Sequence, residues 1–336
     1  MGHTWIRRAS LALSAFAALA LPATAGAQAN LEANFDRALG TEVRAPRDYT
    51  PDFDSALERR IAALADGRQG RIGVHAVDLD TGRAVSVLGD QRFPMASTSK
   101  IAIAATYMEG VEQGRWSLSS EFPLLWPVRS TAFSTRVAPV KAGKYLPAAE
   151  LIELMITRSS NPATDALLKV VGGPEAVNDW ARRNGIREFT LSRDIATLVR
   201  DDGEHDPAQY IDIRDSASPK AMTDLLGGLY RGDFLRESSR RVIIGAMERC
   251  RTGTRRIPAM MPAGVTVAHK TGSLNNTSSD IGVLSTSDGR RIAVAIYVTG
   301  QGAKLNRERK IAQIARAIYD GYTAPGRNWT GANYTN

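Results

Sequence analysis

The sequence predicts an α/β fold of the α+β kind, in which an antiparallel sheet is built from both ends of the domain and flanked by helices. Two observations predict it. Alternation of apolar and polar residues at period two occurs only near the two ends of the 336-residue chain. Between about residues 107 and 250 the clear apolar patterns have helical spacing instead. We therefore expect an all-helical lobe inserted between the two halves of the sheet, with a cleft between lobe and sheet.

The individual elements follow in chain order from the same patterns. Residues 53–65 form an amphipathic helix pattern, and the turn Asp80-Thr81-Gly82 joins two alternating segments into a hairpin. A last amphipathic helix is expected from about residue 307 to 319. The expected strands are 70–79, 84–88, 265–270, 279–285 and 291–298. The expected helices of the middle part are 148–157, 161–171, 174–184, 219–230 and 238–250.

The N-terminal segment has the features of a secretory signal. Arg7 and Arg8 precede an apolar stretch that is too short to span a membrane, and small residues follow it. We expect residues 1–27 to be the signal peptide, with cleavage after Ala27 or as far as Ala29. Residues 28–50 then form a polar tether, 51–323 the domain and 324–336 a C-terminal tail. Within the domain, 51–90 and 251–323 make the α/β part and 91–250 the helical part.

Composition and charge exclude several classes of protein. With 43% hydrophobic and 23% charged residues the chain is globular, and removal of the signal lowers the net charge from +8 to +6, since two arginines leave with it. The basic residues are scattered, which favours a solvated surface over nucleic-acid binding. The single cysteine, Cys250, excludes an internal disulfide, and the histidines lack metal-ligand spacing. We expect no cofactor, no metal, a small-molecule partner and a monomer.

The stretch Ser97-Thr98-Ser99-Lys100 is the first candidate for chemistry. It opens a helical pattern, so Ser97 and Lys100 lie on the same face of its first turn. A serine hydroxyl becomes a useful nucleophile when a base takes its proton, and a lysine desolvated among apolar neighbours is such a base. The N–H groups of the helix start are available to an oxyanion. The alternative is a capped helix with a solvated lysine.

Two further stretches are ambiguous by themselves. Ser159-Ser160-Asn161 joins two expected helices and has the residue types that cap helix starts. Lys270-Thr271-Gly272 ends an alternating segment, where a lysine also serves to protect a strand edge against aggregation. Each stretch taken alone therefore has a purely structural interpretation beside the functional one.

Taken together, in this order, the three stretches resemble the signature of the serine β-lactamase and penicillin-binding protein superfamily, S-x-x-K, S-D-N and K-T-G. Ser97 precedes Ser159 by 62 residues, and Ser159 precedes Lys270 by 111. These separations resemble the class A β-lactamases, and the resemblance covers about residues 50 to 323. The second motif departs from the family pattern, with Ser160 where Asp is usual.

The resemblance implies a role for each matching residue. Ser97 attacks the amide carbonyl carbon of a cyclic amide, and the backbone N–H groups of Ser97 and Ser273 hold the oxyanion. Lys100 accepts or relays the serine proton, and Ser159 passes a proton to the departing nitrogen. Asn161 holds Lys100 in position and bonds the substrate amide. The substrate carboxylate is met by residues of the third motif, with Arg256 as a candidate additional contact; these residues are Lys270, Thr271, Gly272, Ser273 and Arg256.

In the family that the chain resembles, the Ω-loop supplies the carboxylate for deacylation. By resemblance, Arg200 and Asp215 clamp the two ends of this loop. Counting from Arg200, the place of the family's glutamate is occupied by Asp202, which is one methylene shorter. Glu204 is the alternative if the loop is rearranged. Asp165 is another carboxylate expected near this loop.

Three functional hypotheses follow. The first is a secreted, periplasmic serine β-lactamase that hydrolyses penicillins or cephalosporins through an acyl-serine intermediate and confers antibiotic resistance. The second is a penicillin-binding protein-like acylating peptidase, or a β-lactam binder that deacylates slowly. The third is a non-catalytic binding protein on the same scaffold. The intact Ser97, Lys100, Ser159 and Lys270 favour an enzyme.

Overall fold

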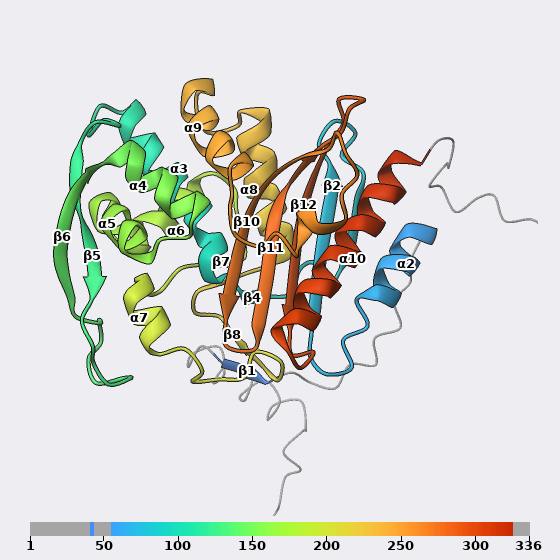
Figure 1. Ribbon diagram of the computed structural model, residues 1–336, viewed down its shortest axis with the longest axis horizontal. Coiled ribbons are helices and arrows are strands. Elements are labelled where there is room, and N and C mark those ends of the chain that lie inside the picture. Colours follow the sequence, from blue (N-terminus) through green and yellow to red (C-terminus); the bar gives the residue numbers. More distant parts are fainter. Residues whose placement is uncertain (1–40, 44–54, 325–336) are drawn as a thin grey trace, which may run out of the picture.

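The computed structural model describes residues 41–43 and 55–324. Its centre is a five-stranded antiparallel sheet in the order β10-β11-β12-β2-β3. The strands are β2 (Ile72–Asp78), β3 (Ala84–Val87), β10 (Thr266–Leu274), β11 (Thr277–Ser285) and β12 (Arg291–Thr299). Strands from the two ends of the domain therefore pair directly, β12 with β2, as Figure 1 shows. The predicted fold class is confirmed.

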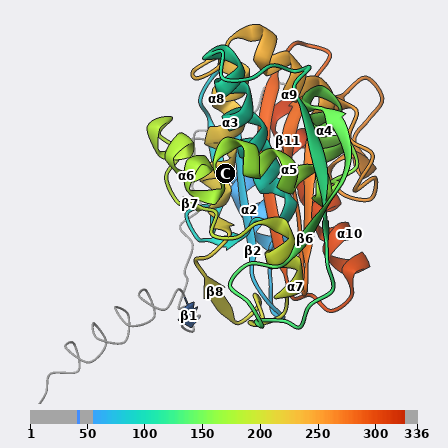
Figure 2. The same cartoon turned by 90° about the vertical axis from the view of Figure 1, so that its left-hand side faces the viewer.

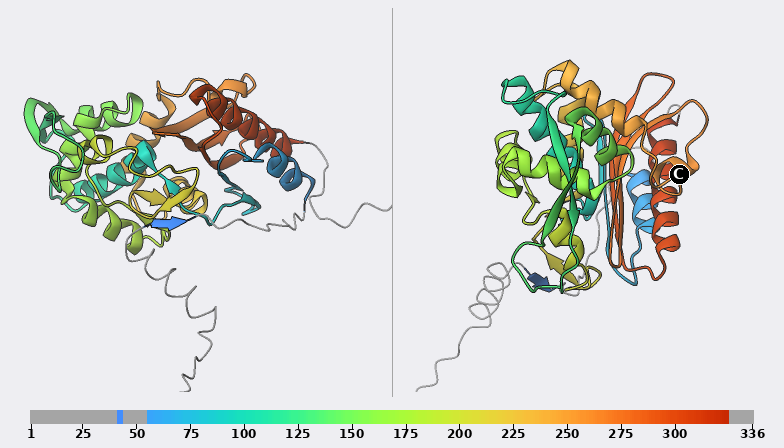
Figure 3. Two further views of the ribbon diagram at one scale, coloured as in Figure 1. Left: turned by 90° about the horizontal axis from the view of Figure 1, so that it is seen from below. Right: turned by 60° about the vertical axis from the view of Figure 1, so that its left-hand side comes forward.

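One face of this sheet is covered by the two terminal helices of the described domain. They are α2 (Ala56–Leu64) and α10 (Lys304–Thr323), and they pack against each other and against the sheet (Figure 3). A capping box fixes the start of α2, because the Ser55 hydroxyl accepts from the backbone of Glu58 while the Glu58 carboxylate accepts from the backbone of Ser55. The apolar stripe of α2 packs against β3 and that of α10 against β11 and β12, in one buried cluster.

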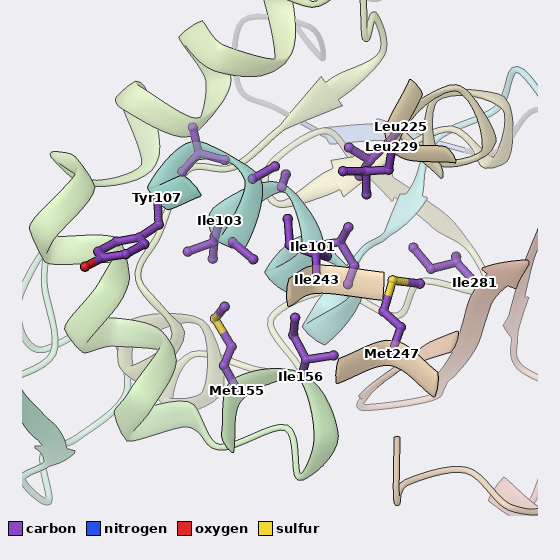
Figure 4. Close-up of a cluster of buried hydrophobic side chains, with 14 of the residues drawn as sticks. Ile101, Ile103, Tyr107, Met155, Ile156, Leu225, Leu229, Ile243, Met247 and Ile281 are labelled. Carbon is purple, nitrogen blue, oxygen red and sulfur yellow. The ribbon is translucent and has the colours of Figure 1, made fainter. Parts of the chain in front are cut away.

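The opposite face carries the helical lobe, whose centre is α3 (Lys100–Glu112). This helix is buried on almost every side, as expected for a helix that is apolar all round. Met155, Leu225, Ile243 and Ile281, from other helices and from β11, lie around it in Figure 4. The surrounding helices are α4 (Ala148–Thr157), α5 (Asn161–Val171), α6 (Pro174–Arg183), α8 (Pro219–Arg231) and α9 (Glu237–Glu248), and shorter ones are η1 (Ala96–Ser99) and α7 (Ile195–Arg200). The short helix η2 (Ile257–Met260) packs instead against α10.

The lobe is not all helical, so that part of the expectation is wrong. An antiparallel ribbon of β5 (Glu121–Pro127) and β6 (Val140–Pro147) runs along its outer side, as Figure 2 shows. Most of the residues of β6 are exposed or partly exposed, so the ribbon lacks the alternating burial that reveals a strand. Short strands also pair at the base of the lobe: β4 (Phe93–Pro94) and β7 (Phe189–Thr190) with β9 (Ser216–Ala217), and β1 (Thr41–Val43) with β8 (Tyr210–Asp212).

The predicted signal peptide, residues 1–27, lies outside the described residues, as do most of the tether and all but the first residue of the tail. Within the described part of the chain, no helix is long and apolar enough to cross a membrane.

Candidate active site

Ser97 and Lys100 come from the junction of η1 and α3, at the base of the buried helix. The turn is held by its own side chains, since the Thr98 hydroxyl donates to the Met95 carbonyl and the Ser99 hydroxyl donates to the Ala96 carbonyl. Ala96 has a φ of 48°, a left-handed conformation that a residue with a Cβ rarely adopts. Backbone strain is thus stored directly before Ser97, as is common at functional sites.

The strand β10 approaches this junction closely because it carries a glycine there. A Cβ on Gly272 would lie 2.7 Å from the Met95 carbonyl oxygen and 2.5 Å from the Ser279 hydroxyl oxygen. Any side chain at this position would push β10 away from η1. The glycine of the third motif therefore lets the strand run directly beside the turn that holds Ser97.

The amine of Lys100 is the centre of a compact polar cluster. Its Nζ donates to the Asn161 side-chain oxygen at 2.8 Å, to the Ser159 carbonyl oxygen at 2.8 Å and to the Ser159 hydroxyl at 3.2 Å. The amine of Lys270 donates to the same Ser159 hydroxyl at 3.0 Å. Residues from three segments that are far apart in sequence are thus brought together, while Ser97 itself is partly exposed.

Both lysines are fully buried, which changes their acid–base behaviour. Burial, together with the positive charge of Lys270, lowers the pKa of Lys100 well below its usual value, although the Asp165 carboxylate opposes the shift. Burial also lowers the pKa of Lys270 to about 8. An amine with a lowered pKa is available as a proton acceptor near neutral pH, which an exposed lysine is not.

The second motif serves both of the roles considered for it. The Ser160 hydroxyl accepts from the backbone N–H of Ala163 and so caps α5. Ser159, one residue earlier, has a φ of 58°, and its hydroxyl accepts from both lysine amines. The capping interpretation is correct for Ser160, and Ser159 belongs to the polar cluster.

The opposite wall of the site is formed by the end of β10. The side chain of Ser273 is exposed, and its hydroxyl accepts from Arg256 at 2.7 Å. Arg256 is 3% exposed and also donates to the carbonyls of Gly272 and Ser279 and to the Glu308 carboxylate. A guanidinium has five donors, and all five of these are engaged. Arg256 thus contacts the site through Ser273, and its expected contact with a substrate carboxylate stays a prediction.

The ends of the Ω-loop are joined by a different arginine from the one expected. Asp215 is 2% exposed and binds the Arg193 guanidinium at 2.6 Å, and it also accepts from the backbone N–H groups of Ser192 and Arg193. Arg200 instead pairs with the adjacent Asp201 at 2.7 Å. The expected Arg200–Asp215 clamp is therefore wrong. The reason is that the short helix α7 begins after Arg193 and ends at Arg200. Arg200 therefore lies one short helix away from the point where the two ends of the loop meet.

The start of α7 is anchored by a carboxylate. Asp165 lies one turn after Asn161 on α5, and its two oxygens accept from the backbone N–H groups of Ile195 and Ala196 at 2.7 and 2.9 Å. Burial raises the pKa of this carboxyl to about 7. Asn161, Asp165, Ile195 and Ala196 line one side of a cavity of about 310 Å³ between α5, α7 and the end of β5. The i, i+4 spacing from Asn161 signals that Asp165 faces the same side, but not what it binds.

The two candidates for deacylation have different surroundings. Asp202 is exposed as a residue, but its carboxylate accepts from the backbone N–H of Asn275 at 2.8 Å, and partial desolvation there raises its pKa. The Glu204 carboxylate binds the Arg214 guanidinium at 2.7 Å. Both residues line a pocket between the Ω-loop and the turn after β10, a pocket whose lining includes Leu274 but not Ser97.

The described residues contain no group of three or more His, Cys, Asp or Glu side chains arranged to hold a metal ion.

The site thus has a serine at the base of a buried helix and two lysines that share a second serine. The chain that forms this site is similar in sequence and in structure to known proteins. The model of the β-lactamase enzyme family matches residues 56–322. The extended-spectrum β-lactamase PER-1 of Pseudomonas aeruginosa is 26% identical over 276 residues, covering 78% of this chain and 86% of that protein. The β-lactamase CARB-3 of Pseudomonas aeruginosa is 27% identical, covering 81% and 92%.

Among solved structures, the ancestral class A β-lactamase of Gram-negative bacteria is 32% identical with a TM-score of 0.69, covering 79% of this chain and 99% of that one. A β-lactamase from Chitinophaga pinensis is 25% identical with a TM-score of 0.67, covering 79% and 97%. The chain belongs to the β-lactamase enzyme family, and it is a serine hydrolase of the class A type.

Proposed function

We propose that the protein is a secreted serine β-lactamase that opens the ring of penicillins and cephalosporins through an acyl intermediate on Ser97. The single observation that carries the proposal is the convergence of two lysine amines on the Ser159 hydroxyl, one of them from Lys100, which lies one helical turn after Ser97. Because this cluster is buried and its amines have lowered pKa values, it is suited to moving a proton.

The proposed acylation step uses each of these groups in turn. The Ser97 oxygen attacks the lactam carbonyl carbon while its proton passes to the neutral amine of Lys100. The backbone N–H groups of Ser97 and Ser273 stabilise the oxyanion that forms. As the carbon–nitrogen bond breaks, the Ser159 hydroxyl gives its proton to the ring nitrogen and takes one from a lysine amine. The products are an ester on Ser97 and a free ring amine.

Substrate binding uses the strand side of the site. A β-lactam antibiotic carries a carboxylate, and the Lys270 ammonium with the hydroxyls of Thr271 and Ser273 offers it charge-assisted hydrogen bonds. Arg256 contributes through Ser273, whose hydroxyl it fixes from behind. Asn161, partly exposed at the start of α5, is placed to bond the amide side chain of the substrate.

Deacylation requires a carboxylate that activates water, and Asp202 is the proposed base with Glu204 as its alternative. The partly buried Asp202 carboxylate has a raised pKa and only one hydrogen bond from another segment, to Asn275, whereas Glu204 is tied to Arg214. A second candidate function, a slowly deacylating penicillin-binding protein, is favoured by one observation: both carboxylates line a pocket that does not include Ser97.

One experiment distinguishes these functions. Purified protein is mixed with excess chromogenic cephalosporin, and turnover is followed while the intact protein is weighed by mass spectrometry. Many turnovers per molecule support the β-lactamase. A single burst with a persistent adduct would support the slowly deacylating binder, and the absence of both would refute the acyl-enzyme proposal.

The proposed location is the periplasm or the exterior, after removal of residues 1–27. The support is the sequence of that segment, together with the lack of a membrane-spanning helix within residues 55–324. We also propose that the mature protein is a monomer. Size-exclusion chromatography with light scattering and N-terminal sequencing of the exported protein test these two statements.

A further inference from the structure

The ribbon of β5 and β6 carries most of the exposed apolar side chains of the described chain. Ten large apolar side chains are exposed within residues 55–324, and six of them lie on these two strands or on the connection between them. The six are Trp126, Val128, Phe133, Val137, Val140 and Tyr145. A single exposed apolar residue is ordinary, but a concentration of them on one element marks an interaction surface. We call residues 126–145 the ribbon surface.

The ribbon surface is also positively charged. Between Glu121 and Glu150 the chain has no acidic residue, although it has four basic ones. These basic residues are Arg129, Arg136, Lys141 and Lys144, and all four are exposed. None of them forms an ion pair with another residue that the structure describes. Their charges are therefore available to a partner that carries negative charge.

An aromatic and a basic side chain share one solvent-facing side of the ribbon. Trp126 on β5 is paired with Lys141 on β6, so their side chains lie on the same face, and both are exposed. Gly143 makes room for the indole ring, because a Cβ there would lie 2.7 Å from two of the ring atoms. The strand β5 packs against α5, and β6 is the outermost strand at one end of the molecule in Figure 1. The ribbon surface is thus accessible to a large, flat partner.

We propose that the ribbon surface binds peripherally to bilayers of anionic phospholipids. Tryptophan and tyrosine combine an apolar ring with a polar atom, which suits the level of the lipid headgroups, while the lysine and arginine charges attract the phosphates. A second copy of this chain fits less well, because it would bring the same positive charges to the contact. Lysines on an outer strand also oppose the pairing of β6 with a strand of another molecule. This binding is independent of β-lactam hydrolysis.

The test measures how much of the exported chain, purified without residues 1–27, sediments with lipid vesicles. The signal is left out because its apolar segment would itself bind lipid. One set of vesicles is phosphatidylcholine alone, and the other is phosphatidylcholine and phosphatidylglycerol in equal parts. We expect the anionic vesicles to bind at least about tenfold more protein, and added salt to weaken this binding because it screens the charges. Equal binding to the two sets, or no binding at low salt, would overturn the proposal.

Two double variants assign the binding to the ribbon surface. Lys141→Glu with Lys144→Glu reverses two of its charges and should lower binding to the anionic vesicles at least about tenfold. Trp126→Ser with Tyr145→Ser removes the exposed rings and should lower it by a similar factor. All four side chains are exposed, so we expect both variants to fold, with the thermal unfolding midpoint of the unmodified protein. Unchanged vesicle binding in both folded variants would refute the proposal.

The matched control is Lys304→Glu with Leu305→Ser, at the start of α10. Both residues are exposed, and Leu305 is 47% exposed, as is Trp126, so this variant makes the same kinds of change outside the ribbon surface. It should bind anionic vesicles as the unmodified protein does, and an equal loss in this variant would contradict the assignment to the ribbon. Dimers that form without vesicle binding and disappear in Trp126→Ser with Tyr145→Ser would assign the surface to a second copy of the chain and overturn the proposal.

Discussion

The two polar regions beside Ser97 differ in how they are held together. The lysine–serine cluster is formed by side chains at the ends of helices and on a central strand, and every expected member of it, Lys100, Ser159, Asn161 and Lys270, is in contact with another. In the Ω-loop, by contrast, Asp215 binds Arg193 instead of Arg200. In the first region Lys100, Asn161 and Lys270 lie on regular elements and Ser159 lies two residues before α5, whereas the second region is a connection between elements.

The difference teaches which spacings can be transferred between related chains. Inside α3 or α5 the helical period determines on which face a side chain lies, so a count of residues is a statement about space. In a loop, a short helix such as α7 changes the path of the chain. A count of residues through such a segment does not determine which arginine reaches Asp215.

The largest expected effect is a loss of activity when the serine beside the lysine–serine cluster is replaced. Ser97→Ala removes the only proposed nucleophile, so hydrolysis of a chromogenic cephalosporin should fall by at least about a thousandfold, without a covalent adduct in the intact mass. Ser119→Ala, at an exposed serine, is the matched control and should retain activity. Retained turnover in Ser97→Ala would remove the basis of the comparison, because the cluster would then not be the catalytic one.

The next effect tests the carboxylates of the Ω-loop. Asp202→Asn keeps the size of the side chain but cannot accept a proton, so turnover should fall by about a hundredfold and the acyl-enzyme should accumulate in the mass spectrum. Glu204→Gln is the comparison, since Glu204 is already bound to Arg214. The reverse result, a trapped adduct only in Glu204→Gln, would assign deacylation to Glu204.

A smaller effect, on stability, is expected from the Arg193–Asp215 ion pair that joins the two ends of the Ω-loop. Arg193→Ala leaves the buried Asp215 carboxylate with only its backbone donors, which should lower the free energy of unfolding by about 2 kcal/mol in urea. Arg200→Ala removes the ion pair with the adjacent Asp201 and two hydrogen bonds to the exposed Thr135, in the connection between β5 and β6, and should cost less than Arg193→Ala. Equal losses from the two variants would contradict the assignment of the clamp to Arg193.

The pH dependence of kcat/KM tests the role of Lys270 in the lysine–serine cluster. Lys270 must be an ammonium to bind the substrate carboxylate, and its pKa is lowered to about 8. The rate should therefore fall about tenfold per pH unit above pH 8, as the ammonium loses its proton. In Lys270→Arg the guanidinium stays charged, so this alkaline fall should disappear. A profile that is flat to pH 10 in the unmodified protein would refute this role.

Much of the fold could be predicted from periodicity alone. The helices α4 and α5 begin and end where the pattern indicates, and the strands of both chain ends form one sheet. The ribbon of β5 and β6 could not be predicted in this way, because strands that lie on a lobe with most of β6 open to solvent carry no alternating burial. The signal peptide prediction lies outside the described residues and stays a prediction.

The sequence by itself determined the elements and the chemical groups: a serine and a lysine one turn apart, a second serine before a helix, and a lysine on a strand. Only the tertiary structure decided the partners. Arg193 rather than Arg200 binds Asp215, Asp165 anchors α7, and Arg256 fixes Ser273 from a buried position. The physical reason is that local spacing sets the direction of a side chain within one element, whereas a contact between elements depends on the path of the whole chain.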